Sequence, residues 1–230
     1  MNCSHVMLKV SDLHQAVRDF RELGFVVDYA SAERKARHAH IWFAKGPIIE
    51  ILTTPPGAEL LKWPIDLAFG RGSGTRMTRW ARAAEGFCDV AVVTREPDLA
   101  EPSQRLRRAG VAMGRAVKWT RSRPDGAQTR FQFAYPRNDR LPFLVSPYDP
   151  PQHPAEVAHP NGATGLTGVH MDVSPADRPA FDLIAGDDPV FTPTTADLTR
   201  ITAIELSGLA GDLDPALLHG GLIRPTSRRI

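Results

Sequence analysis

The chain has 230 residues, 42% of them hydrophobic, which is enough for one large domain or two small ones with a substantial core. Its net charge is +2, and no run of five or more like charges argues for a nucleic-acid or membrane-surface protein. Two distant cysteines, Cys3 and Cys88, do not indicate a disulfide framework or a zinc knuckle. Without a signal-peptide pattern or an apolar run of about 20 residues, we expect a cytoplasmic protein.

The first 54 residues indicate one β-α-β-β-β module. Alternating side chains predict a strand at residues 4–10, with His5, Met7 and Lys9 on one face. A helix should follow over residues 12–23, capped by Ser11 or Asp12 and ended by Gly24, because glycine adopts the left-handed conformation at low cost. Three further strands are expected at residues 25–30, 38–44 and 48–53.

Residues 55–85 form a predicted connector that is irregular until a helix at 77–84. Its glycine-rich stretch at 70–75 could offer backbone N–H groups to an anion, but it matches no phosphate-binding fingerprint, and a flexible connection is the simpler interpretation. Arg76, Arg79 and Arg82 recur at helical spacing on one face. This pattern is typical of a solvated stripe more often than of an anion clamp.

The strand and helix pattern restarts at residue 86, and such an internal repeat should govern the fold. The second module covers residues 86–148, with strands at 87–94, 111–119, 129–135 and 142–145 and a helix at 98–109. A proline-rich connection follows at 149–165. A shorter third unit at 166–207 should contain a strand at 166–173, a helix at 175–185 and a strand at 200–206, before a C-terminal tail at 208–230. The expected fold class is α+β, with tandem βαβββ modules and a truncated third βαβ-like unit.

Glu50 is the unusual residue of the first module, because it interrupts the apolar run Ile-Ile-Glu-Ile-Leu. A buried carboxylate is costly unless it is paired or binds a cation. Histidine and glutamate together suit Zn, Mn, Fe or Ni, so His5 and Glu50 are candidate metal ligands. The alternative to a metal site is that His5 has a structural role with a hydrogen-bonded ring and that Glu50 pairs with an arginine.

Other residues could complete or replace this site. His38 and His40 are two apart on a predicted strand and therefore project to one face, where they could chelate a metal or simply lie on an edge strand. A structural role is the simpler interpretation for His153, His159 and His170. The last of these shares one strand face with Asp172. Cys88 neighbours Asp89 but should face the other side of its strand, as a buried thiol rather than a nucleophile. Four tryptophans and several phenylalanines could line an apolar cup or belong to the core.

The paired modules resemble the vicinal oxygen chelate superfamily and, within it, the glyoxalase-like domain branch. The resemblance covers most of residues 1–207 and is carried by SHVMLKVSDLHQAVRDFRELGF, IIEILTTP, RRAGV, RSRPDG and HPNGATGLTGVHM. It implies a half-closed β-barrel cup whose metal ligands come from the first and last strand of each module. By carry-over, His5, Glu50 and Asp89 match three ligand positions. The fourth position, near Leu144 to Ser146, has no carboxylate.

The resemblance implies a small-molecule lyase, isomerase or dioxygenase that uses a divalent metal held by His5, Glu50 and Asp89, with Glu50 also as the catalytic residue. The missing fourth ligand motivates an alternative, a metal-free protein that binds or sequesters a small molecule, as resistance relatives do. In both cases the expected partner is a small molecule, not a nucleic acid or a membrane, and a homodimer is one option. A shared fold supports many reactions, so the sequence does not name the substrate.

Overall fold

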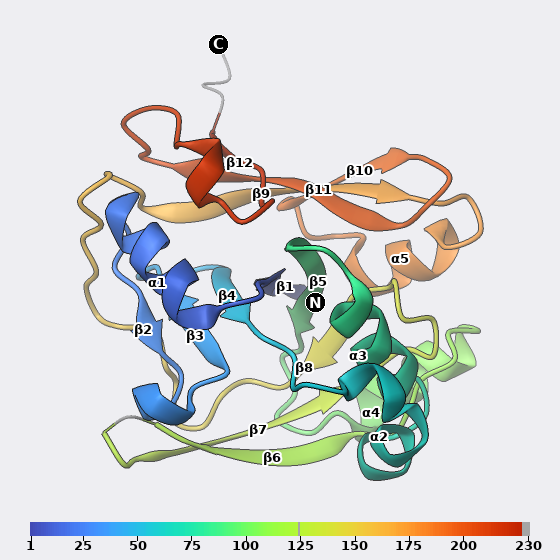
Figure 1. The fold of residues 1–230 in the computed structure, drawn as a ribbon. Coiled ribbons are helices and arrows are strands. Elements are labelled where there is room, and N and C mark those ends of the chain that lie inside the picture. The colour runs from blue at the N-terminus through green and yellow to red at the C-terminus, as the bar shows by residue number, and fades with distance from the viewer. Residues whose placement is uncertain (124, 227–230) are drawn as a thin grey trace.

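The computed structural model describes residues 1–123 and 125–226, and it contains two sheets of eight and four strands (Figure 1). The first module folds as predicted near its start. Asp12 caps the first helix by accepting hydrogen bonds from the backbone N–H groups of His14 and Gln15, and Gly24 ends it at φ 82°. The strand predicted at 25–30 is reduced to two residues. The elements of this module are β1 (Asn2–Lys9), α1 (Leu13–Glu22), β2 (Asp28–Tyr29), β3 (His38–Ile41) and β4 (Ile48–Leu52).

The second module repeats this order, with Gly110 ending its helix at φ 91° as Gly24 does in the first. Its first strand carries a β-bulge opposite Met7 and Leu8, which adds one residue to the strand and changes the direction of its side chains. Pro124, in the predicted turn at 123–126, lies outside the described residues. The elements are β5 (Gly86–Val93), α4 (Ala100–Arg108), β6 (Val117–Ser122), β7 (Gln128–Ala134) and β8 (Phe143–Val145).

The two modules join edge to edge into one sheet with the order β2-β3-β4-β1-β5-β8-β7-β6. β1 and β5 pair antiparallel at its centre, while β1 pairs parallel with β4 and β5 pairs parallel with β8. Each half of the sheet therefore repeats the strand order of the other. The sheet curls into a half-barrel, so the structure has the predicted α+β architecture of tandem modules forming a cup (Figure 1).

The connector at 55–85 is more regular than predicted, because it forms α2 (Lys62–Phe69) and α3 (Ser73–Arg82). The Asp66 carboxylate accepts hydrogen bonds from the N–H groups of Gly72 and Gly74, at 3.0 and 2.9 Å. Those N–H groups are the ones that an anion would use at this helix start. A Cβ on Gly74 would lie 2.1 Å from the Lys62 carbonyl oxygen, so the glycine allows the two helices to meet. The glycine-rich stretch thus joins two packed helices.

The third unit forms the second sheet, with the order β10-β9-β11-β12. The sequence predicted two of its strands and its helix, but it missed β10 and placed β12 in a C-terminal tail. Residues 227–230 of that predicted tail lie outside the described residues. The elements are β9 (Gly165–Val173), α5 (Arg178–Ala185), β10 (Phe191–Thr195), β11 (Arg200–Ser207) and β12 (Ile223–Pro225).

The second sheet packs against the outer, convex face of the large sheet, across its central strands (Figure 1). Val6 and Leu8 of β1 and Val90 and Val92 of β5 share one buried core with side chains of the second sheet. The concave face holds a smaller cluster that includes Met7, Leu52, Trp80 and Phe143. The third unit therefore covers the outside of the cup. In the described part of the chain, no helix is long and apolar enough to cross a membrane.

Candidate functional site

Glu50 lies on the concave face of the large sheet because β4 alternates its side chains. Ile49 and Ile51 point into the outer core with α1, while Glu50 and Leu52 point into the cup. The strand register places Glu50 beside Met7 of β1 on one side and His40 of β3 on the other. Only 7% of Glu50 is exposed, so its carboxylate depends on neighbouring polar groups for solvation.

Three imidazoles surround the Glu50 carboxylate. His5 Nε2 lies 3.2 Å from Glu50 Oε2, His38 Nδ1 lies 2.6 Å from Oε1, and His40 Nε2 lies 3.6 Å from Oε1. Ser4 Oγ, 3.1 Å from His5 Nδ1, orients the His5 ring. The predicted pair His5 and Glu50 is thus brought together, and the two-residue spacing of His38 and His40 delivers both to the same face.

Burial sets the charges in this cluster. Burial lowers the pKa of His5 to about 4, although the Glu50 carboxylate opposes the shift, and burial also lowers the pKa of His40. For Glu50, burial would raise the pKa, but hydrogen bonds from His38 and His40 outweigh it and hold the pKa well below its usual range. At neutral pH the site therefore contains a carboxylate next to neutral imidazoles of His5 and His40. These are the protonation states in which histidine and glutamate bind a metal.

Arg121 is the contribution of the second module, and it was not among the predicted site residues. Its Nη1 lies 3.4 Å from His40 Nε2, and its guanidinium stacks over Phe131 and Tyr148, at 5.6 and 5.9 Å from the ring centroids. Gln152 accepts a hydrogen bond from Nη2 at 3.2 Å, but no carboxylate among the described residues forms an ion pair with Arg121. This half-buried cation is available for an anionic group.

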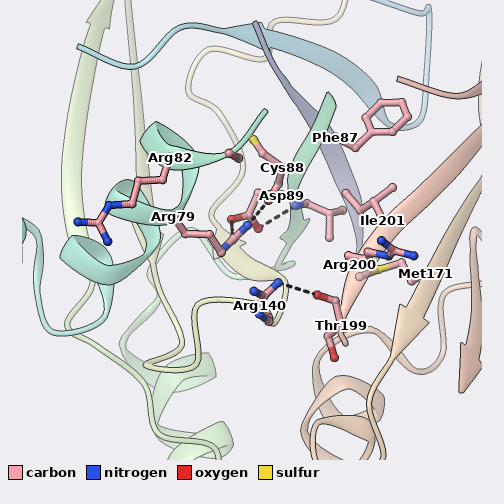
Figure 2. Close-up of a pocket in the computed structure, with 12 residues that line it drawn as sticks. Arg79, Arg82, Phe87, Cys88, Asp89, Arg140, Met171, Thr199, Arg200 and Ile201 are labelled. Carbon is pink, nitrogen blue, oxygen red and sulfur yellow. Dashed lines mark hydrogen bonds and ion pairs between the residues drawn. The ribbon is translucent and has the colours of Figure 1, made fainter. Parts of the chain in front are cut away.

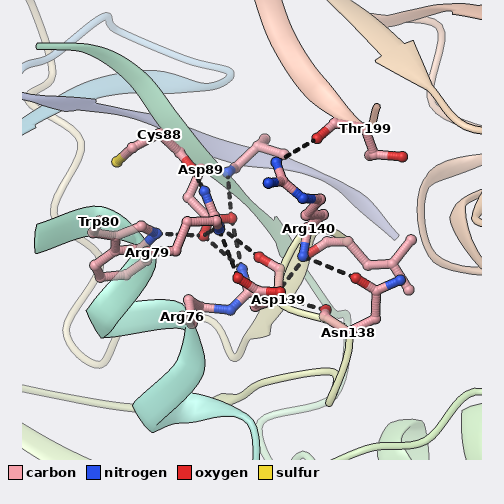
Figure 3. A network of polar contacts seen from close by, with 11 residues as sticks. Arg76, Arg79, Trp80, Cys88, Asp89, Asn138, Asp139, Arg140 and Thr199 are labelled. Atoms are coloured by element: carbon pink, nitrogen blue, oxygen red, sulfur yellow. Dashed lines mark hydrogen bonds and ion pairs between the residues drawn. The ribbon is translucent and has the colours of Figure 1, made fainter. Parts of the chain in front are cut away.

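Asp89 lies elsewhere on the concave face. The register pairs His5 with Ala91 and Met7 with Asp89, and Asp89 lies beside Cys88 on β5, facing Arg79 (Figure 2). Its oxygens accept hydrogen bonds from Arg76 Nη1 at 2.7 and 2.6 Å, from Arg79 Nη2 at 2.9 Å and from Trp80 Nε1 at 2.8 Å (Figure 3). The structure does not bring Asp89 into contact with His5 or Glu50.

Arg76 and Arg79 of α3 correct the prediction of a solvated stripe, whereas Arg82 is exposed as predicted. Arg76 has no exposed surface, and its guanidinium lies over the rings of Tyr135 and Phe143, at 5.1 and 5.6 Å. Burial of this cation is compensated by the Asp89 carboxylate and the Leu141 carbonyl oxygen. The β-bulge also corrects the expected direction of Cys88, which packs with Met7 and Trp80 on the concave side. Burial raises the pKa of this thiol, so it remains protonated and unreactive.

The position that lacks a fourth ligand is filled by apolar side chains. Phe143 and Val145 of β8 point into the concave cluster, and Leu144 points into the outer core. The Phe143 ring meets the His5 ring edge to face, with 5.7 Å between centroids. Among residues 1–123 and 125–226, no group of three or more His, Cys, Asp and Glu side chains is arranged to hold a metal ion.

The remaining predicted histidines have structural partners. His159 Nδ1 accepts a hydrogen bond from the Val26 N–H at 3.0 Å, and its Nε2 donates to the Trp42 carbonyl oxygen at 2.9 Å, so it fastens the proline-rich connection to the first module. His153 donates to the Phe43 carbonyl oxygen, at 2.9 Å. His170 pairs with Glu205 at 2.8 Å, while Asp172 pairs with Arg200 at 3.0 Å, both on the second sheet.

A hollow of about 610 Å³ opens at the rim of the cup, next to the Glu50 cluster. Two of its lining residues contact members of the site. The Trp42 ring lies 5.0 Å from the His40 ring, and Gln152 is hydrogen-bonded to Arg121. The volume is in the range that holds a small organic molecule.

The paired modules, with His5 and Glu50 on the first and last strands of module one, define a vicinal-oxygen-chelate-type cup. A family model described as a glyoxalase-like domain matches residues 3–184, and the chain belongs to this family. No curated protein matches the chain.

Among solved structures, a hypothetical protein from Staphylococcus aureus is similar, with 12% identity, a TM-score of 0.67 and coverage of 96% of this chain and 97% of that one. A xylose isomerase-like TIM barrel/4-hydroxyphenylpyruvate dioxygenase fusion protein has 10% identity and a TM-score of 0.43, over 90% of this chain and 36% of that one. The similarity to the Staphylococcus aureus protein shows a shared fold alone.

Proposed function

We propose that this protein is an enzyme of the lyase, isomerase or dioxygenase type that acts on a small organic molecule, with a divalent metal held by His5 and Glu50. The observation that carries the proposal is the state of the Glu50 carboxylate, which is buried, held ionised and surrounded by imidazoles. Asp89, the buried carboxylate of the second module, is instead compensated by two arginines. Glu50 has no such partner among the described residues.

His5 and Glu50 fit a metal as a pair of ligands. Their 3.2 Å separation is close to the roughly 3.3 Å between two ligands at typical zinc bond lengths in a tetrahedral sphere. Their protonation states are also suitable. Since no third donor of the described residues is arranged with them, water or substrate oxygens would supply the other ligands. Asp89 is left out of the proposed site because its oxygens are occupied by Arg76, Arg79 and Trp80.

When bound, the metal would supply Lewis acidity to adjacent oxygens of the substrate. The protein's own side chains have separate tasks. Arg121 binds an anionic oxygen of the substrate, and the faces of Phe131 and Tyr148 keep its guanidinium in place. His38, whose side chain is 39% exposed, can pass a proton between Glu50 Oε1 and solvent through its 2.6 Å hydrogen bond. Phe143 excludes water from the far side of His5.

Metal content tests the proposal directly. The untagged protein is loaded with Zn, Mn, Fe or Ni in turn, and bound metal is quantified by elemental analysis and by titration calorimetry. We expect about one ion per chain, lost in His5→Ala and Glu50→Gln and retained in Arg121→Met. His170→Ala is the matched control, because it removes a second His–Glu pair at 2.8 Å outside the cup. Absence of bound metal after loading, or equal metal binding by His5→Ala and the wild type, would contradict the metal role. Either result would favour metal-free binding of a small molecule.

A further inference from the structure

A second cavity, of about 450 Å³, lies away from the Glu50 cluster (Figure 2). It is enclosed by the end of α3, the start of β5, the loop before β8, and residues 199–201 of the second sheet. It is therefore formed where the third unit meets the second module. None of His5, His38, His40, Glu50 and Arg121 lines it.

The charge of its lining is strongly positive. Its charged side chains are four arginines and a single carboxylate, Asp89. That carboxylate cannot neutralise the cavity, because its oxygens already accept hydrogen bonds from Arg76, Arg79 and Trp80 (Figure 3). Arg79 is also fully engaged, with Asp139 on Nε and the Cys88 carbonyl oxygen on Nη1. The Arg82 guanidinium points away from the other labelled residues in Figure 2, so Arg140 and Arg200 are the two lining arginines left to bind an anion.

Arg140 and Arg200 both retain unused donors. Arg140 makes one long hydrogen bond, 3.4 Å, to the Thr199 carbonyl oxygen, which is neutral and leaves its charge uncompensated. Arg200 uses Nε for Asp172 at 3.0 Å, and this pair leaves both of its Nη groups available. An anion that accepts hydrogen bonds from Arg140 and from the free Nη groups of Arg200 would compensate positive charge that Asp89 leaves unneutralised.

The other wall of the cavity is apolar and comes from Phe87, Met171 and Ile201. Phe87 lies on β5, whereas Met171 and Ile201 belong to the second sheet and lie on the opposite side from Arg79 in Figure 2. We propose that this cavity binds a small organic oxyanion, with a phosphate or carboxylate group at the arginines and an apolar group against Phe87, Met171 and Ile201. The site is separate from the proposed reaction site and does not depend on it.

Titration calorimetry at low salt tests this with phenyl phosphate and benzoate, which carry the two head groups on the same apolar ring. Inorganic phosphate and phenol serve as the two half-probes. Phenyl phosphate or benzoate, or both, should bind saturably and more tightly than inorganic phosphate or phenol. Added salt should weaken binding because the contacts are ionic. The tighter of the two compounds identifies the head group.

The double variant Arg140→Ala/Arg200→Ala should weaken binding by roughly tenfold or more, because it removes the charge-assisted hydrogen bonds to the head group. The matched control is Arg105→Ala/Arg108→Ala, which removes the same charge from the exposed face of α4. Arg121→Ala separates the two sites and should leave affinity unchanged. The inference is overturned if neither compound binds at millimolar concentration, if both double variants lose equal affinity, or if only Arg121→Ala abolishes binding.

Discussion

The two modules have the same strand order but use the concave face of the sheet differently. In the first module, this face carries an ionised glutamate among imidazoles, with His38 open to solvent. In the second module, the equivalent region is filled by Ala91, Phe143 and Val145, and its buried carboxylate is bound to arginines from α3. Among the described residues of the second module, Arg121 is the charged side chain that reaches the polar cluster of the first.

This difference separates two ways to bury a carboxylate. Asp89 is compensated by cations that lie within hydrogen-bonding distance, so its energy is that of a structural ion pair. Glu50 is held by neutral or weakly basic groups, which keep it ionised without neutralising it. A carboxylate in the second situation retains negative charge to offer a cation or a substrate. The comparison predicts that the first module supplies the metal ligands, while the second module, apart from Arg121, contributes stability.

The largest effect should follow from removal of the Asp89 carboxylate. Asp89→Ala leaves the fully buried Arg76 without its partner, and we expect the free energy of unfolding to fall by about 3–5 kcal/mol. Urea denaturation measures this loss of unfolding free energy. The double variant Arg76→Met/Asp89→Leu should recover most of the loss, because no uncompensated charge remains. A loss below about 1 kcal/mol in Asp89→Ala would contradict the contrast drawn between Asp89 and Glu50, since Asp89 would then not be a structural anion.

Phe143→Ala tests whether the second half of the cup is packed as a core. Phe143 is 4% exposed and contacts the His5 ring and the Arg76 guanidinium. We expect a loss of about 3 kcal/mol in unfolding free energy from lost contacts and the cavity left behind. Trp63, at 80% exposure, supplies the control, and Trp63→Ala should change stability by less than about 0.5 kcal/mol. Similar small effects for both variants would argue against this packing role.

His159→Ala distinguishes a structural imidazole from those of the site. Loss of its hydrogen bonds to Val26 and Trp42 should cost about 1–3 kcal/mol. Burial lowers the pKa of His159 in the folded protein. Its stabilisation is therefore fully present above the unfolded value of about 6.5 and decreases as the pH falls from there toward the folded pKa. Urea midpoints at pH 7.5 and 5.5 should differ more in the wild type than in His159→Ala, and an equal or larger difference in the variant would contradict this role.

Glu50→Gln should have the smallest effect on stability. The substitution keeps the shape of the side chain and removes a buried charge that has no cationic partner among the described residues. We expect a loss of about 1 kcal/mol in the free energy of unfolding, because the amide accepts the hydrogen bonds of His38 and His40 more weakly than the carboxylate does. Thermal and urea denaturation at pH 7.5 measure the change. A loss as large as that of Asp89→Ala would remove the distinction between the two carboxylates.

Periodicity and glycine positions were enough to predict both modules. The alternation in β1 and β4, the Asp12 cap and the stops at Gly24 and Gly110 are local signals, and the structure reproduces them. The pairing of His5 with Glu50 followed from the repeat and the resemblance. Local signals failed for α2, where Trp63 and Leu67 are exposed and Pro64 occupies the first turn. An amphipathic pattern is therefore missing there, although proline is tolerated at a helix start.

The parts of the site that depend on tertiary structure were not predictable. Helical spacing placed Arg76, Arg79 and Arg82 on one face, but spacing does not say whether that face meets water or a buried carboxylate. A single β-bulge reversed the expected direction of Cys88. Arg121 reaches His40 across the curl of the sheet, from a residue 81 positions later in the chain. The only sequence clue was its presence in the RSRPDG element.

The second sheet has a practical consequence for truncation of the protein. The family match ends at residue 184, before β10, β11 and β12. A fragment cut there would lose Ile201, Ile204 and Leu206, which cover the outer side of β1 and β5, and also the link from His219 to Asp19 of α1. Such a fragment would present the apolar strand surface to water and self-associate. Expression and assay of this protein therefore require the chain through at least Pro225.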